Sequence, residues 1–164
     1  MKLNNLQELF VEEMQDLYSV EQQIIKALPD MIEKTSAPEL RSALTQHLEE
    51  TRGQVRRLDQ IFAQIPDVDK DDKTCKGMKG IIDDAKDILK AKGEADVRDA
   101  GIIAGAQRVE HYEIAGYGTV RTYAQLLGRR DWAQLLEQTL QEEKLADEKL
   151  TRLSERVNIE AKAA

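Results

Sequence analysis

Residues 5–28 read NLQELFVEEMQDLYSVEQQIIKAL, and this stretch carries the pattern that decides the fold. Hydrophobic side chains recur along it every three or four residues, which is the spacing that places them on one face of an α-helix. The face comprises Leu6, Phe10, Met14, Leu17, Glu21, Ile24 and Leu28. Asn5 with Glu8 three residues later predicts a capped helix start. Pro29 predicts that the helix kinks or ends there, leaving residues 30–34 as a bent tail.

Three later segments show the same helical periodicity. The second helix is expected to open at Ser36-Ala-Pro-Glu39, which has the pattern of a capping box with proline in the first turn. The third is expected to begin with Asp96 as its N-cap, to include Asp99 at its third position and to end at Gly128. Asp131 is predicted to cap the fourth helix.

The lengths of the connections predict the topology. Residues 35–37 and 128–131 are short enough to join antiparallel neighbours, whereas the charged, turn-rich residues 66–95 can cross the length of a bundle. Residues 81–91 within that crossover have the pattern of a short fifth helix. A short loop, a long crossover and a second short loop is the connectivity of ferritin-like bundles. We therefore predict an all-α, ferritin-like four-helix bundle whose crossover, between the second and third helices, carries a short extra helix.

Length and composition agree with one helical domain. The chain has 164 residues, of which 34% are charged and 41% apolar, with only 9 glycines and 3 prolines. This balance suits amphipathic helices and leaves few turns for an all-β fold. We expect a single domain over residues 1–164, with residues 159–164 as a frayed tail.

Charge and cysteine content limit the expected partners and compartment. A net charge of −7 disfavours nucleic acid, anionic membranes and acidic substrates, because their binding requires clustered Lys and Arg. No run approaches the ~20 apolar residues of a membrane span, and the first residues do not have the pattern of an export signal. The single cysteine, Cys75, cannot form an intramolecular disulfide, which favours a cytoplasmic location and an inert thiol.

Acidic residues and a histidine interrupt all four hydrophobic stripes near the middle of each helix. Several carboxylates cannot be buried together as bare anions, because each desolvated charge costs several kcal/mol unless it is paired or bound to a cation. Ferritin-like di-iron and di-manganese proteins hold two cations with carboxylates and histidines on facing helices. The candidate metal ligands are Glu21 on the first helix, His47 and Glu50 on the second, Glu110 and Glu113 on the third, and Glu143 and Asp147 on the fourth.

The candidate ligands depart from the usual di-metal arrangement. That arrangement has Glu-x-x-His on two helices, whereas this chain has the reverse order, His47-x-x-Glu50, and no histidine on the fourth helix. The other histidine, His111, points about 100° away from the stripe. A single histidine among carboxylates favours Mn or Fe over Zn. The choice between Glu110 and Glu113 as the ligand from the third helix stays open.

Each of these residues also has a structural interpretation. A mid-helix glutamate is most often solvated or salt-bridged, and a core histidine is often bonded to a carboxylate. The alternative is therefore a metal-free, dimerising bundle with protonated or salt-bridged inner carboxyls, acting as a structural or interaction protein. Tyr18 and Tyr117 are candidate hydrogen-bond donors beside a metal centre, although such tyrosines more often serve in packing.

Four glycines lie in the third long helix, where each costs about 1 kcal/mol relative to alanine. They are Gly101, Gly105, Gly116 and Gly118. They predict the close approach of a neighbouring helix or subunit, or a local distortion beside the site.

Four blocks of this sequence carry a resemblance to a known family. They are DLYSVEQQ (16–23), HLEETRGQ (47–54), VEHYEIAGYG (109–118) and EEKLAD (142–147). In order and spacing they resemble the bacterial YciF/YciE-like stress-protein family. The resemblance implies a homodimeric, ferritin-like bundle associated with the stress response, whose molecular function is unassigned.

The resemblance also implies a carboxylate-bridged metal centre, and our leading hypothesis is a stress-related protein whose Fe or Mn site handles peroxide or another oxidant. Its ligands would be Glu21, then His47 with Glu50, then Glu110 or Glu113, then Glu143 with Asp147. Neither a catalytic activity nor a small-molecule substrate is identified by the sequence.

Overall fold

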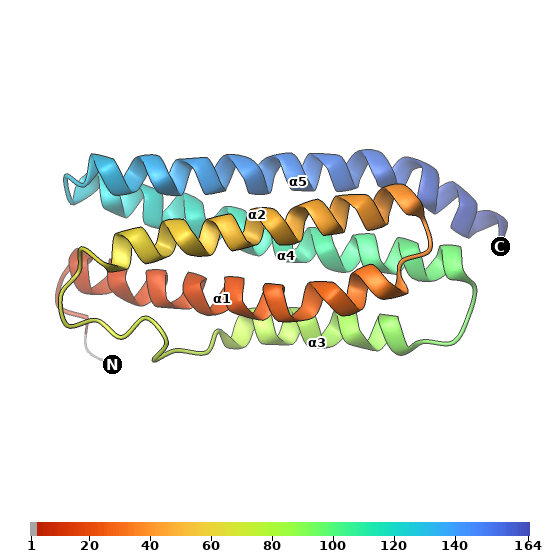
Figure 1. Cartoon of the computed structure of the whole chain (residues 1–164), viewed down its shortest axis with the longest axis horizontal. Coiled ribbons are helices and arrows are strands. Elements are labelled where there is room, and N and C mark those ends of the chain that lie inside the picture. Colours follow the sequence, from red (N-terminus) through yellow and green to blue (C-terminus); the bar gives the residue numbers. More distant parts are fainter. Residues whose placement is uncertain (1–2) are drawn as a thin grey trace.

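The computed structural model describes residues 3–164, which form five α-helices and no strand. The helices are α1 (Leu6–Lys34), α2 (Pro38–Phe62), α3 (Lys76–Lys90), α4 (Ala95–Leu126) and α5 (Arg130–Ala163), shown in Figure 1. α1 packs along α2 and α4 packs along α5, while contacts of α1 with α4 and of α2 with α5 join the two pairs into one bundle. The shorter α3 packs on α4 and α1. The prediction of an all-α fold is confirmed.

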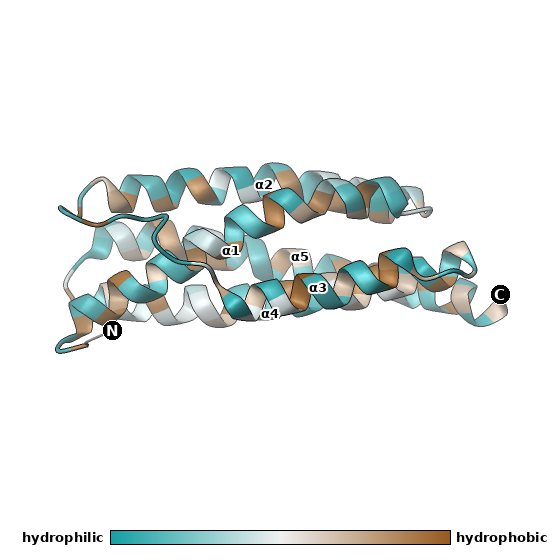
Figure 2. Ribbon diagram, turned by 90° about the horizontal axis from the view of Figure 1, so that it is seen from below, coloured by the Kyte–Doolittle hydropathy of each residue, from teal (hydrophilic) through white to brown (hydrophobic). Residues whose placement is uncertain are grey.

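The core consists of two hydrophobic clusters with a polar layer between them. Along α2, Leu44 belongs to one cluster and Leu58 to the other, and the buried residues His47, Thr51 and Gln54 lie between them. The same order is found on the other long helices, whose buried polar residues at this level are Glu21, Glu110, Glu113 and Glu143. Figure 2 shows the hydrophobic and hydrophilic bands that alternate along the helices. The interruptions of the four stripes therefore meet at one level of the bundle.

The first helix does not end at its proline. α1 continues through Pro29 to Lys34, so the alternative in which the helix stops there is wrong. Met31, beyond the proline, is buried in the core, and this burial favours continuation of the helix. The start of α1 agrees with the prediction, since the Asn5 side chain accepts a hydrogen bond from the Glu8 backbone N–H at 2.9 Å.

The starts of α2 and α4 differ from the prediction. Ala37, rather than Ser36, is the N-cap of α2, and its side chain makes no capping hydrogen bond. Instead the buried carboxylate of Asp99, on α4, accepts hydrogen bonds from the backbone N–H groups of Ser36 (3.0 Å) and Ala37 (2.6 Å). α4 itself begins at Ala95, so the predicted N-cap, Asp96, lies in its first turn. A residue distant in sequence therefore satisfies the donors of the α1–α2 turn.

The crossover helix is longer than its sequence pattern predicts. α3 begins at Lys76, before the predicted start at residue 81, because Cys75 serves as its N-cap. The Cys75 Sγ accepts a hydrogen bond from the Met78 backbone N–H at 3.4 Å. Cys75 is buried, and burial raises the pKa of its thiol, in agreement with an inert role.

The turn between α4 and α5 uses glycine as predicted but a different cap. Gly128 has a φ of 74°, in the left-handed region that favours glycine. Arg129, rather than the predicted Asp131, is the N-cap of α5. Asp131 lies in the first turn of α5, where its negative charge interacts favourably with the positive end of the helix dipole. Its carboxylate also accepts a hydrogen bond from the Arg129 guanidinium at 3.0 Å.

The glycines of α4 are explained largely by neighbours within the same chain. A methyl group at Gly101 would lie 2.5 Å from Ile88 Cγ2 of α3, and one at Gly116 would lie 2.8 Å from a Leu17 methyl carbon of α1. Gly105 likewise faces α3, whereas Gly118 has no atom within 4 Å. The predicted homodimer therefore gains no support from these glycines and stays a prediction. Among the described helices, none is both long and apolar enough to cross a membrane.

Candidate metal centre

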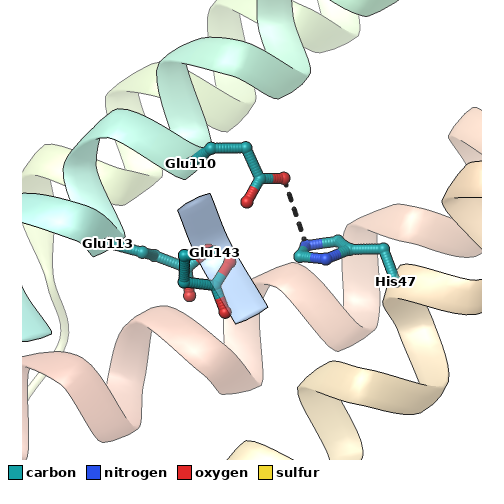
Figure 3. Close-up of side chains that lie close together, drawn as sticks. All are labelled: His47, Glu110, Glu113 and Glu143. Carbon is teal, nitrogen blue, oxygen red and sulfur yellow. Dashed lines mark ion pairs between the residues drawn. The ribbon is translucent and has the colours of Figure 1, made fainter. Parts of the chain in front are cut away.

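Three helices bring four potential metal ligands together in the polar layer. His47 comes from α2, Glu110 and Glu113 from α4, and Glu143 from α5, and all four side chains are buried. Each offers one ligand atom, and these atoms all lie within 4.8 Å of one another (Figure 3). Glu110 and Glu113 are three residues apart, so both face the same side of α4. The structure thus brings both of the alternative third-helix ligands to the site, and these four residues are positioned to hold a metal ion.

Many polar atoms of this layer have no hydrogen-bond partner within the described chain. The closest approach between His47 and Glu110 is 3.4 Å from Nε2 to Oε1, marked in Figure 3, and it does not have hydrogen-bond geometry. A buried polar atom left unsatisfied costs about 1–3 kcal/mol, and more when it is charged. The unsatisfied atoms of this layer are both ring nitrogens of His47, both carboxyl oxygens of Glu113, one carboxyl oxygen each of Glu21, Glu110 and Glu143, and the side-chain oxygen of Gln54.

Burial shifts the ionisation of these groups strongly. It raises the pKa values of Glu21, Glu110 and Glu113 well above 4.5, and the nearby Glu143 carboxylate raises them further. Burial also raises the pKa of Glu143 to about 7 and lowers the pKa of His47 to about 4. In the absence of a cation, the raised pKa values therefore favour the protonated form of these carboxyls, with Glu143 about half-protonated at neutral pH, and the imidazole is neutral. A bound cation reverses this preference, because ligands lose their protons when they coordinate it.

Two uncharged side chains orient the carboxyls. The Tyr117 hydroxyl donates a hydrogen bond to Glu21, which places this α1 residue at the edge of the four-residue group. The Gln54 amide donates to Glu143. Tyr117 is therefore a hydrogen-bond donor at this site, as the sequence suggested. Gln54 was not identified from the sequence as a donor. Its signal was present, because it lies seven residues after His47 and so on the same helix face.

Three predicted ligands lie outside the group of four: Glu21, already described, Glu50 and Asp147. Glu50 is half-buried, and its carboxylate accepts a hydrogen bond from the Gln46 amide at 2.7 Å. Asp147 is partly exposed and accepts hydrogen bonds from His111 (Nε2, 3.1 Å) and Gln107 (Nε2, 3.1 Å). The His111 side chain is exposed to solvent, as its position off the stripe predicts.

The fold and the polar layer define a class of protein. It is an all-helical bundle whose hydrophobic core is interrupted by a layer of buried glutamates and one histidine. Within that class, the chain belongs to the family described as Domain of unknown function (DUF892), which matches residues 5–164.

Two relatives support this assignment. Protein YciF of Escherichia coli (strain K12) is 42% identical over 154 residues, covering 94% of this chain and 93% of YciF. The crystal structure of the E. coli stress protein YciF has a TM-score of 0.90, at 41% identity, and covers 94% of this chain and 98% of that one. The structure of YcfI from Rhodopseudomonas palustris has a TM-score of 0.87, also at 41% identity, and covers 92% and 95% of the two chains.

Proposed function

We propose that this protein is a stress-response-associated, ferritin-like four-helix bundle that binds Fe or Mn in its polar layer. The observation that carries the proposal is the absence, within the described chain, of hydrogen-bond partners for both oxygens of the fully buried Glu113. Its neighbours Glu110, Glu143 and His47 are also incompletely satisfied. The association with stress rests on the similarity to YciF, which is described as a stress protein.

The donor set fits cations that prefer oxygen ligands. Four buried carboxyls, from Glu21, Glu110, Glu113 and Glu143, surround one imidazole. Two divalent cations would balance four carboxylates, as in the di-metal sites of other helical bundles. Carboxylate-rich donor sets favour Mn and Fe, whereas thiolate or several imidazoles would favour Zn or Cu. When bound, such a metal supplies redox chemistry toward peroxide or another oxidant.

The chain's own residues have identifiable tasks in this proposal. Tyr117 orients Glu21 and Gln54 orients Glu143, so that neither carboxyl needs to reorganise fully when a cation arrives. The two hydrophobic clusters on either side of the layer limit its contact with water. His47 remains neutral down to about pH 4, so its nitrogen lone pair is available to a metal at neutral pH.

Titration of chelator-treated protein with Mn²⁺, followed by elemental analysis, tests the proposal. The wild type is expected to bind about two cations per chain. The Glu113→Gln variant keeps the side-chain shape but removes the charge, and it should lose most of the bound metal. Glu148→Gln, at an exposed position of α5, is the matched control and should bind like the wild type. Peroxide consumption by Fe-loaded wild type and Glu113→Gln then tests the link to oxidants.

The alternative function is that of a metal-free dimerising bundle. The raised pKa values of the inner carboxyls favour this reading, because a protonated carboxyl can donate a hydrogen bond to a neighbouring one. The glutamates would then satisfy one another without a cation. A wild type that contains no metal and does not respond to Mn²⁺ or Fe²⁺ would assign this second function.

A further inference from the structure

A cavity of about 140 Å³ lies between α2 and α5 and reaches the candidate metal centre. Apolar side chains such as Leu44, Leu145 and Leu150 form much of its wall, and we call it the polar cavity after the charged and polar side chains that line the rest. His47 and Glu110 are among its lining residues, and Gln46, Glu50, Glu142 and Lys149 line it as well. The His47 side chain is only 7% exposed, and neither of its ring nitrogens has a hydrogen-bond partner in the described chain. A cavity of this size and polarity has room for several water molecules.

The opposite approach to the centre has a different character. A second cavity, of about 30 Å³, also reaches His47 and Glu110, and its walls are mainly apolar side chains of α1, α3 and α4 such as Ile24, Ile82 and Val109, with Asp30 and Lys86 as its other charged lining residues. A hydrated divalent cation does not pass through so narrow and apolar a space, because it would lose its water without gaining ligands. Of the two cavities, the polar cavity therefore offers charged species the more favourable path to the centre.

The charges at the mouth of the polar cavity are unequally compensated. Glu142 is ion-paired with Arg57, which donates to it at 2.7 Å. Lys149 donates to the Gln46 side-chain oxygen at 2.8 Å, and the Gln46 amide donates in turn to Glu50 at 2.7 Å. Among the described residues, no cationic group pairs with Glu50. Its carboxylate is thus the one at this mouth that keeps an uncompensated charge, one helical turn from His47.

We propose that the polar cavity is the uptake route of the metal centre, and that Glu50 is an outer carboxylate that first binds the hydrated divalent cation and passes it to His47 and Glu110. This inference rests on the proposed metal-binding function and deepens it. Lys149 opposes the step, because its positive charge lies at the same mouth. The two residues are therefore expected to affect the rate of uptake in opposite directions.

Stopped-flow mixing of chelator-treated protein with Co²⁺, followed by its visible absorption, measures this rate. Glu50→Gln should slow uptake on the order of tenfold, and Lys149→Met should accelerate it. The difference between the two variants should shrink at high ionic strength, because salt screens exposed charges. Glu49→Gln is the matched control: Glu49 is adjacent in sequence but exposed and paired with Arg52, so its loss should leave the rate unchanged.

The amount of Co²⁺ bound at the end of the reaction separates the possible failures. If the polar cavity is the uptake route, Glu50→Gln and Lys149→Met should bind as much Co²⁺ as the wild type but reach that amount at different rates. Equal rates in all variants, with Co²⁺ fully bound, would overturn the uptake route and leave the metal centre standing. A reduced final amount in Glu50→Gln would make Glu50 a ligand of the centre instead. Wild-type protein that binds no Co²⁺ would overturn both proposals together.

Discussion

The cation-free protein is expected to lose stability as the pH rises from about 6.5 to about 8.5. In the folded chain the pKa values of Glu21, Glu110 and Glu113 lie well above 4.5, and that of Glu143 is about 7. In the unfolded chain such carboxyls are already ionised above pH 6. A group whose pKa is raised on folding contributes stability at low pH, and that stability is lost as the pH rises through the folded value.

The structure sets the size of this effect. Each carboxyl that is protonated in the folded state but ionised in the unfolded state lowers the unfolding free energy by about 1.4 kcal/mol for each unit by which the pH rises. Glu143, with a pKa of about 7, should lose its proton within this range and contribute about 1 kcal/mol. The raised pKa values of Glu21, Glu110 and Glu113 lower the unfolding free energy in the same direction as the pH rises. The pKa of His47, lowered from 6.5 to about 4, contributes only below this range, where stability falls as the pH falls.

Urea unfolding followed by far-UV circular dichroism, in the presence of chelator, measures the slope. The Glu113→Gln variant, which has one titrating group fewer, should show a smaller decline of unfolding free energy with pH. With saturating Mn²⁺ the decline should vanish or reverse in the wild type, because the ligands are then deprotonated when folded. A metal-free wild type whose stability is constant or rises from about pH 6.5 to about 8.5 would refute the protonated carboxyl layer.

Five substitutions test a hydrogen bond to the polar layer, the packing of α4 and the capping of the α1–α2 turn. Tyr117→Phe removes the hydrogen bond to buried Glu21 and should lower the unfolding free energy by about 1–3 kcal/mol and weaken Mn²⁺ binding, as measured by urea unfolding and calorimetry. Gly118→Ala should stabilise the protein by about 1 kcal/mol, because alanine favours the helix and nothing lies near the added methyl group. The added methyl group of Gly116→Ala would lie 2.8 Å from Leu17, so thermal melts should show this variant to be about 1–3 kcal/mol less stable than Gly118→Ala. Asp99→Ala leaves two N–H groups of the α1–α2 turn uncapped and should cost about 1–3 kcal/mol in urea unfolding, while Asp96→Ala should cost less.

The sequence was sufficient for the helices and for the level of the polar layer. Hydrophobic periodicity is a local signal, and each of the four long helices has 25 residues or more, so these helices could be predicted. Since Glu21, His47, Glu113 and Glu143 each replace a core position near mid-helix, their meeting could also be anticipated.

Features that depend on a distant partner could not be predicted. Asp99 accepts hydrogen bonds from backbone N–H groups that lie more than sixty residues earlier in the chain. The local sequence predicts only that Asp99 lies near the start of its own helix. Asp147 follows Glu143 by four residues and so lies about 6 Å further along α5, where its carboxylate accepts hydrogen bonds from His111 and Gln107. The glycines of α4 signalled a close neighbour, but only the packing of α3 identifies that neighbour at Gly101.

Crystals grown with Mn²⁺ and measured at the manganese absorption edge test the central claim most directly. Anomalous scattering locates the metal without relying on its chemistry or on any activity. We predict anomalous peaks for two cations in the polar layer, at least one of them enclosed by His47, Glu110, Glu113 and Glu143, and no such peaks in Glu113→Gln. An ordered polar layer without a peak, in which the glutamates donate hydrogen bonds to one another, would contradict the metal centre.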